Sequence, residues 1–189
     1  GVYRLSARPD GLPPSQPELY LPAPDGEDLI GFYHGPSGRD WASTAKGTFR
    51  IDNGHWTLLP GQPVASATLL EARDGTLWAF GNNGLFAIKG TKAERILTSP
   101  KIMLDPVRAL FEDVRGDIWV GLIGGLARIR GGKVELVPLE GNMRPGDFVK
   151  VIYQTKDLAI WATTNWGRLI RVDAPVFHNI TVADGLSED

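Results

Sequence analysis

Tryptophan recurs along this 189-residue chain at a spacing that few folds can use. Trp41, Trp78, Trp119 and Trp161 are separated by 37, 41 and 42 residues. Each is followed six residues later by a glycine, and these glycines are Gly47, Gly84, Gly125 and Gly167. An offset that is repeated four times indicates one structural unit used several times, with a period of about 40 residues.

Each unit is predicted to contain four short strands. The stretch "SATLLEARDGTLWAFGNNGLFAI" gives an apolar strand, a polar turn, a strand that carries the tryptophan, a second turn and a third strand, and "AERILTS" supplies a fourth. Twenty-three glycines and fourteen prolines favour many turns, and no unit has a sustained helical period. A four-stranded antiparallel sheet has two faces to cover, and radial stacking lets neighbouring sheets cover each other.

The predicted fold is therefore all-β and consists of β-propeller blades, with the four repeated tryptophans as anchors in the core between blades. We expect the four repeated glycines to adopt a positive φ, or to allow close approach, at the hairpin after each tryptophan strand. Trp56 lies outside the repeat, in "GHWTLL", where we expect a partly exposed packing role in an outer strand.

The phase of the repeat suggests a segment of a larger propeller. "GVYRL" matches the strand after the tryptophan, and "DGLSED" resembles the lead-in "DGLPPSQ". About four and a half blades are expected. The predicted boundaries are the end of a preceding blade at 1–9, blades at 10–60, 61–99, 100–138 and 139–181, and the lead-in to a further blade at 182–189.

Composition excludes several classes of function. The net charge of -2 without long charged runs argues against a nucleic-acid partner. No apolar stretch is long enough to insert into a membrane. The chain has no cysteine, and its three histidines, His34, His55 and His178, lie too far apart in sequence to suggest a metal site. No motif for a cofactor appears, so none is expected.

The units "LFEDVRGDIWVGLIGGLARI" and "LLEARDGTLWAFGNNGLFAI" resemble the two-component regulator propeller repeat. The resemblance covers nearly the entire chain and is weakest in "VIYQTKDLAIWATTNWGRLIRV", where the turn has Asp157 and no glycine. It implies a periplasmic sensor region of a bacterial membrane-bound signalling protein, such as a hybrid histidine kinase or a diguanylate cyclase. It also implies oligosaccharide or other small ligands, and the remainder of the receptor as a partner.

Ligand-binding residues are expected on the rim formed by the loops between the second and third strands and by the loops between blades. Amides and an exposed indole suit a sugar, whose hydroxyls need donors and acceptors and whose ring stacks on an aromatic. The alternative is that the asparagines serve as turn residues, since they tolerate positive φ. The candidates for the site are Lys46, Asn82, Asn83, Arg144, Asn165 and Trp166.

Two alternatives to a sensor remain at this stage. A glycosidase needs two positioned carboxylates, and Glu71 with Asp74 or Glu112 with Asp113 are the candidates. These pairs recur at matching positions of the repeat, which is typical of turns, so we predict no catalytic residues. The second alternative is a non-catalytic scaffold that dimerises within a longer receptor, since open blade faces favour self-association.

Overall fold

The structure is a computed structural model, and it describes residues 2–4, 18–59, 66–81, 84–97, 109–139, 143–172 and 177–180. Strands dominate these residues, and the described helix is a single 3-10 turn, η1 (Pro24–Gly26). None of the described helical segments has the length and apolar character needed to cross a membrane.

Four antiparallel sheets, each of four strands, follow one another along the chain. A two-stranded sheet precedes them, formed by β1 (Val2–Arg4) and β2 (Glu18–Leu21). The first full sheet consists of β3 (Gly31–His34), β4 (Asp40–Thr44), β5 (Gly47–Asp52) and β6 (His55–Leu58). The second consists of β7 (Ser66–Glu71), β8 (Leu77–Gly81), β9 (Gly84–Lys89) and β10 (Lys92–Leu97). The third consists of β11 (Leu110–Glu112), β12 (Ile118–Leu122), β13 (Gly125–Arg130) and β14 (Lys133–Pro138). The fourth consists of β15 (Val149–Gln154), β16 (Ile160–Thr164), β17 (Leu169–Val172) and β18 (Phe177–Ile180).

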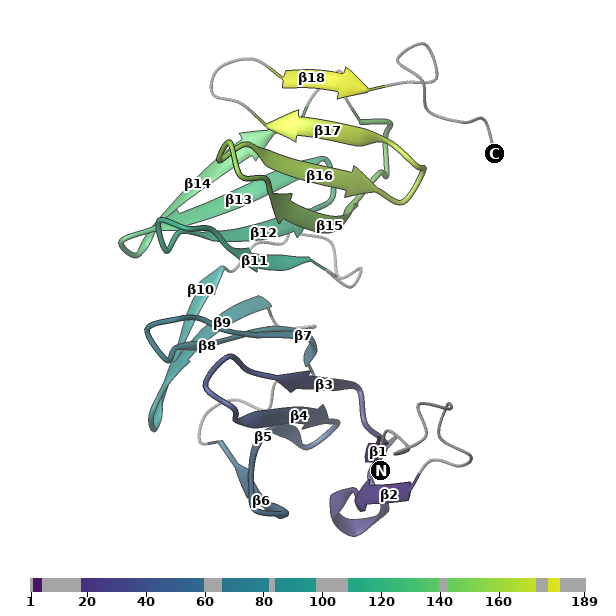
Figure 1. Cartoon of the computed structure of the whole chain (residues 1–189), viewed down its shortest axis with the longest axis vertical. Coiled ribbons are helices and arrows are strands. Elements are labelled where there is room, and N and C mark those ends of the chain that lie inside the picture. The colour runs from purple at the N-terminus through teal and green to yellow at the C-terminus, as the bar shows by residue number, and fades with distance from the viewer. Residues whose placement is uncertain are drawn as a thin grey trace, which may run out of the picture.

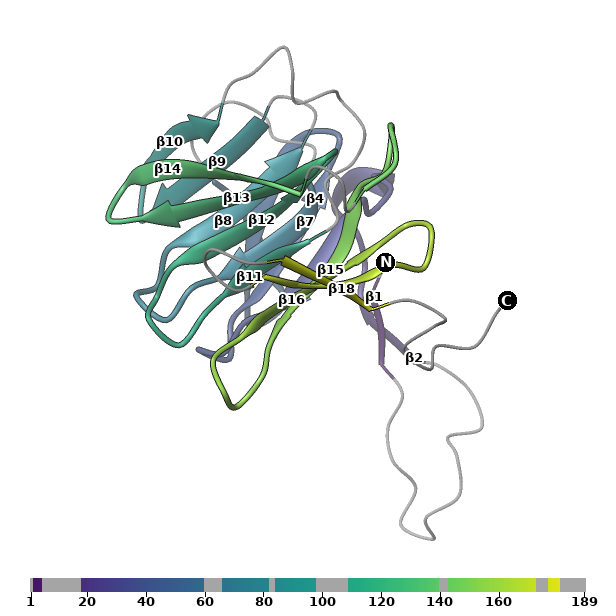
Figure 2. The same cartoon turned by 90° about the horizontal axis from the view of Figure 1, so that it is seen from above.

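The four sheets stack face to face, from β3–β6 at the bottom of Figure 1 to β15–β18 at the top. Viewed along the stack, the strands of successive sheets overlie one another (Figure 2). The first strands lie side by side, β3 against β7, β7 against β11 and β11 against β15. This is the arrangement of neighbouring propeller blades, each with its first strand innermost, and the predicted fold class is confirmed.

Three of the four repeated tryptophans pack against the next sheet along the chain. Trp41 packs against Leu77 and Phe86 of the second sheet. Trp78 packs against the third sheet and Trp119 against the fourth, in two further clusters. These three side chains are at most 9% exposed.

Trp161 differs from the other anchors because no described sheet covers its face. It is half-buried, and its ring lies beneath the Arg171 guanidinium, 5.8 Å from the ring centroid. Tyr153, its partner on the neighbouring strand, is 61% exposed. The expectation of a core position therefore does not describe Trp161 within this chain.

The repeated glycines do not all have the expected conformation. Gly47, Gly84 and Gly167 have positive φ, at 144°, 115° and 75°. In the third sheet the positive φ of 76° belongs to Gly124 rather than Gly125, although Leu122 pairs with Gly125 as Thr44 pairs with Gly47. Asn82 and Asn83 lie outside the described residues.

The turn without glycine in the fourth unit is built like the others. In all four turns the first residue's N–H donates to the fifth residue's carbonyl, as Asp113 does to Asp117 at 3.0 Å. The fourth residue has positive φ, 84° at Gly116 and 68° at Leu158. A leucine in this region costs roughly 1–2 kcal/mol, so this turn is strained where its sequence departs from the repeat.

The boundary between the half blade and the first full blade lies later than expected. β2 pairs with β1, and the four-stranded sheet begins only at Gly31, whereas we placed the start of that blade at residue 10. The similarity between "DGLPPSQ" and "DGLSED" therefore does not mark the first strand of a four-stranded blade. The predicted lead-in at 182–189 lies outside the described residues.

Candidate functional site

The hairpins between second and third strands form one edge of the stack, which we call the hairpin rim (residues 45–46, 123–124 and 165–166). Here the segment 143–148 joins the third and fourth sheets. Phe148 donates its N–H to Asn165 Oδ1 at 2.8 Å and accepts the N–H of Asn165 at 3.1 Å. The N–H of Gly124 donates to the Asp147 carbonyl at 2.9 Å.

Three of the six predicted ligand-binding residues come together on the hairpin rim. Trp166 is 65% exposed, directly after the tethered Asn165. Arg144 is exposed on the joining segment, where its N–H donates to Asp147 Oδ2 at 2.8 Å. The side-chain oxygen of Asn165 is used to hold this segment, which is neither contact with a ligand nor the capping of its own turn.

A buried carboxylate lies beneath these residues and was missed by the sequence analysis. Asp147 is fully buried, and its Oδ1 accepts no hydrogen bond from any described residue. A lone Asp in a loop gives no signal of burial, since aspartate is typical of exposed turns. Asp147 therefore holds one acceptor without a described donor on the same short segment as Arg144.

Lys46 lies apart from this group. It belongs to the hairpin between β4 and β5, so two sheets separate it from the hairpin of Asn165. Its ammonium lies 3.3 Å from Glu27 Oε1. The structure therefore does not place Lys46 in one site with Arg144 and Trp166.

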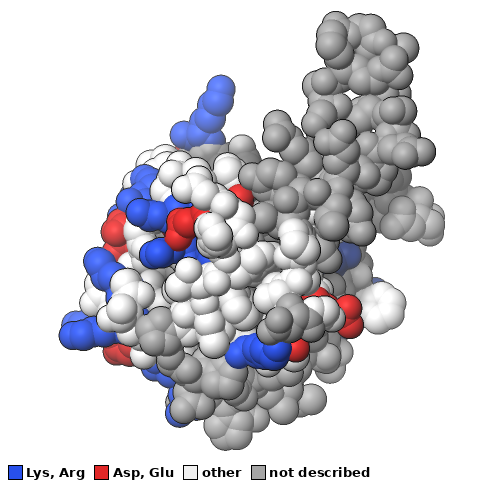
Figure 3. Space-filling view, turned by 90° about the horizontal axis from the view of Figure 1, so that it is seen from below, with Lys and Arg blue, Asp and Glu red and all other residues white. Residues whose placement is uncertain are grey.

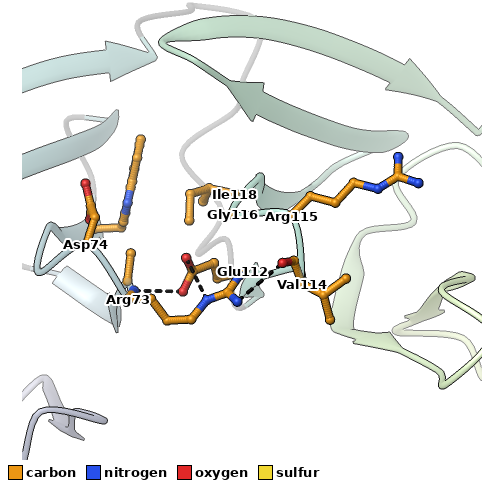
Figure 4. Close-up of a pocket in the computed structure, with 9 residues that line it drawn as sticks. Arg73, Asp74, Glu112, Val114, Arg115, Gly116 and Ile118 are labelled. Carbon is orange, nitrogen blue, oxygen red and sulfur yellow. Dashed lines mark hydrogen bonds and ion pairs between the residues drawn. The ribbon is translucent and has the colours of Figure 1, made fainter.

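The turns between first and second strands form the opposite edge, which we call the turn rim (residues 35–39, 72–76, 113–117 and 155–159). A cavity of about 480 Å³ opens here between the turns of the second and third sheets. Figure 4 shows its lining, with Arg73 and Asp74 on one side and Glu112 and Val114 on the other. The sequence analysis placed the candidate site on the other rim and missed this cavity.

Hydrogen bonds across the turn rim connect each blade to the next. Glu112 Oε2 accepts the Arg73 N–H at 2.9 Å, and Gln154 Oε1 accepts the Val114 N–H at 2.9 Å. The equivalent residue of the second sheet, Glu71, is 2% exposed. These carboxylates therefore hold neighbouring blades together, at the positions where a glycosidase pair was considered.

Titration on the turn rim is perturbed by burial and by local hydrogen bonds. Burial raises the pKa of Asp74, but hydrogen bonds from Thr76 and the ammonium of Lys89 outweigh it, so the pKa lies below its usual value. Burial also raises the pKa of Tyr33, and the charges of Glu71 and Glu112 add to the increase.

A buried charge cluster lies on the third sheet. Asp117 is buried and binds two arginines, Arg128 at 2.6 Å and Arg130 at 2.7 Å. On the face shown in Figure 3, acidic and basic side chains are mixed around the edge. Among the described residues, no three His, Cys, Asp or Glu side chains are grouped so that they could hold a metal ion.

No protein-family model matches the sequence, and no curated protein matches it significantly. Solved structures share its fold. Virginiamycin B lyase from Staphylococcus aureus superposes with a TM-score of 0.66 at 18% identity, over 92% of this chain and 60% of the lyase. The chain therefore spans less than two thirds of that protein.

Two extracellular domains described as parts of hybrid two-component systems of B. thetaiotaomicron also superpose. That of BT4673 has a TM-score of 0.66 at 17% identity, over 88% of this chain and 23% of its own. That of BT3049 has a TM-score of 0.64 at 22% identity, over 87% of this chain and 24% of its own. The resemblance to a propeller family is thus confirmed at the level of the fold.

Proposed function

We propose that this chain is part of the ligand-sensing, extracytoplasmic region of a membrane-bound bacterial signalling receptor, in the periplasm. The similarity of its repeat to the two-component regulator propeller supports this, as does the shared fold with extracellular domains of two-component systems. A fold alone does not fix a function, so a sensor must also present a surface that can bind a ligand.

The ligand that we propose is an oligosaccharide bound on the hairpin rim, and Trp166 carries this proposal. Its indole is 65% exposed, although the residue beside it is tied to Phe148 by two hydrogen bonds. An exposed aromatic ring on a fixed hairpin suits the apolar face of a sugar. Arg144 lies exposed on the adjoining segment and supplies a polar group for sugar hydroxyls.

Calorimetric titration with short oligomers of glucose, xylose, mannose and galactose tests this proposal. We expect one class to bind and Trp166→Ala to weaken it at least about tenfold, which is about 1.4 kcal/mol. Tyr153→Ala is the matched control, because Tyr153 is also 61% exposed but lies near the end of β15 that leads to the turn rim. Binding that survives Trp166→Ala, or equal loss in both variants, would reject the hairpin rim as the sugar site.

We propose that the segment is not itself catalytic, although the similar lyase is an enzyme. Glu71 and Glu112 occupy equivalent positions and bind the turn of the preceding blade. Asp113 accepts hydrogen bonds from the N–H groups of its own turn. Engagement of these three carboxylates supports a structural role for them rather than acid–base work.

The second candidate function is an association surface, and the face of the fourth sheet favours it. Val151 and Tyr153 are 55% and 61% exposed there, and Trp161 is half-buried. Apolar side chains at the equivalent face of the third sheet, Phe111 and Trp119, pack against a neighbouring blade. Analytical ultracentrifugation of the chain and of Tyr153→Lys separates the sensor from the scaffold. A dimer of the unchanged chain that dissociates in Tyr153→Lys supports the scaffold.

A further inference from the structure

Each turn of the turn rim forms one small unit with the repeated tryptophan that follows it. We call this unit a frame, and number the four frames by their sheets. In each, the first residue lies six positions before the repeated tryptophan, and its backbone closes the turn. The side chain of this first residue is therefore carried towards the indole N–H. The first residues are Gly35, Ala72, Asp113 and Thr155.

In the third frame a carboxylate fills the space below the indole. Asp113 is 3% exposed, and its Oδ2 accepts the Trp119 Nε1–H at 3.0 Å. Its Oδ1 accepts the N–H groups of Arg115 at 2.8 Å and Asp117 at 3.0 Å. One carboxylate thus satisfies three donors of the frame.

The first and fourth frames are also filled by oxygen-bearing side chains. Thr155 Oγ1 accepts the Trp161 Nε1–H at 3.2 Å. In the first frame a Cβ added at Gly35 would overlap Oε2 of Glu71, so the carboxylate of the next blade occupies this space. There Glu71 accepts the Ser37 hydroxyl at 2.7 Å, although it does not accept the Trp41 indole N–H, which has no acceptor among the described residues. The first frame is thus filled by a carboxylate, and no room is left in it for a ligand.

The second frame has no such oxygen. Its first residue is Ala72, and no described residue accepts a hydrogen bond from the Trp78 indole, which is 9% exposed and lines the 480 Å³ cavity. The N–H of Asp74, which corresponds to that of Arg115, also lacks an acceptor among the described residues. Two donors that bind a carboxylate in the third frame are therefore left without one.

The sequence explains why the next blade leaves this frame open. Glu112 corresponds to Glu71, but it is drawn outward by the N–H of Arg73 at 2.9 Å and by its guanidinium at 3.2 Å (Figure 4). The residue that corresponds to Arg73 in the first turn is Pro36, which has no N–H to donate. Glu71 therefore turns inward, whereas Glu112 does not.

We propose that the cavity between the second and third sheets binds a small organic carboxylate. Its carboxylate would take the place that Asp113 occupies in the third frame, accepting hydrogen bonds from the Trp78 indole and from the N–H of Asp74. A volume of about 480 Å³ lies within the range of small-molecule sites, about 300–1,000 Å³.

The charged residues that line the cavity are two carboxylates, Asp74 and Glu112, and two guanidinium groups, Arg73 and Arg115. Glu112 is paired with Arg73, and Asp74 lies 3.4 Å from Lys89. Arg115 lines the cavity and makes no ion pair with a described residue, although its side chain extends away from the cavity in Figure 4. The site lies on the rim opposite Trp166 and does not depend on the sensor function.

Nuclear magnetic resonance of the six indole N–H groups tests this site directly. Trp78→Phe identifies the Trp78 signal, and the chain is then titrated with acetate, D-glucuronate and uncharged D-glucose. We expect both carboxylates to move the Trp78 signal saturably below about 10 mM, with D-glucose at least tenfold weaker. An unmoved Trp78 signal in both carboxylate titrations, or equal binding of D-glucose, overturns the proposal.

Two variants at one position then test the geometry. Ala72→Asp recreates the acceptor of Asp113, so it should move the Trp78 signal without ligand and weaken glucuronate binding at least tenfold. Ala72→Val places γ-carbons where the ligand carboxylate would lie, so it should also weaken glucuronate binding, but it offers the indole no acceptor and should leave the Trp78 signal of the ligand-free chain unmoved. A Trp78 signal that moves equally in both ligand-free variants, or in neither, would show that residue 72 does not address the indole N–H.

Discussion

Asp113→Ala is expected to be among the most destabilising single substitutions on the turn rim. The carboxylate is 3% exposed and accepts three hydrogen bonds, from two backbone N–H groups and from the Trp119 indole at 3.0 Å. The N–H of Asp117 and the indole are both buried, and a buried donor without an acceptor costs about 1–3 kcal/mol. Allowing for the desolvation that the carboxylate no longer incurs, we expect a loss of about 3 kcal/mol.

Urea unfolding followed by tryptophan fluorescence measures this loss, and thermal unfolding should show a Tm lower by roughly 6–12 °C for a chain of this size. Asp113→Asn keeps the shape and one acceptor, so it should lie between the native chain and Asp113→Ala. Asp74→Ala is the matched control, since Asp74 caps its turn from an exposed position and should cost less than about 1 kcal/mol. If Asp113→Ala costs no more than Asp74→Ala, the indole and turn donors do not depend on this carboxylate.

Three further predictions concern other turns of the same rim. Leu158→Gly should stabilise the chain by up to about 1 kcal/mol in urea unfolding. The φ of 68° strains a leucine, and the free energy gained by removing this strain exceeds the free energy that glycine costs through its larger loss of chain entropy. A destabilised variant would contradict the strain. Gly35→Ala should destabilise by about 2 kcal/mol, because the added methyl overlaps the buried Glu71 carboxylate, and an unchanged Tm would mean that Glu71 moves freely. The pKa of Asp74 is lowered in the folded chain, so its contribution is complete above the unfolded pKa near 3.8 and is lost as the pH falls through the lower folded value; Asp74→Asn should therefore reduce the stability lost below about pH 4, and identical acid transitions would contradict this.

The repeat in the sequence predicted most of the fold because one residue type has one role in every blade. Trp41, Trp78 and Trp119 each pack on the following sheet, so their spacing marks the blades. Trp161 has the same sequence context but no described neighbour on its outer face. Burial of a repeat residue depends on what stands beside the blade, and a repeat pattern does not contain that information.

The candidate sites were harder to predict, because a motif describes what the repeats share. Trp166 stood out as an aromatic outside the repeat, and the structure places it on an exposed hairpin. The cavity at Ala72 arises where one blade lacks an oxygen-bearing side chain that others supply. Aligning "EARDG" with "EDVRG" places Ala72 opposite Asp113, so the sequence shows that one turn lacks a carboxylate. That this carboxylate binds the Trp119 indole can be seen only in the structure.

The role of this chain in a membrane-bound receptor is tested most directly by the reading frame of its parent gene. We predict that the same polypeptide carries further propeller repeats, a membrane-spanning helix and a cytoplasmic output module such as a histidine kinase or a diguanylate cyclase. A frame that encodes no membrane segment and no output module would contradict the proposed receptor and leave the propeller to act as a free-standing protein.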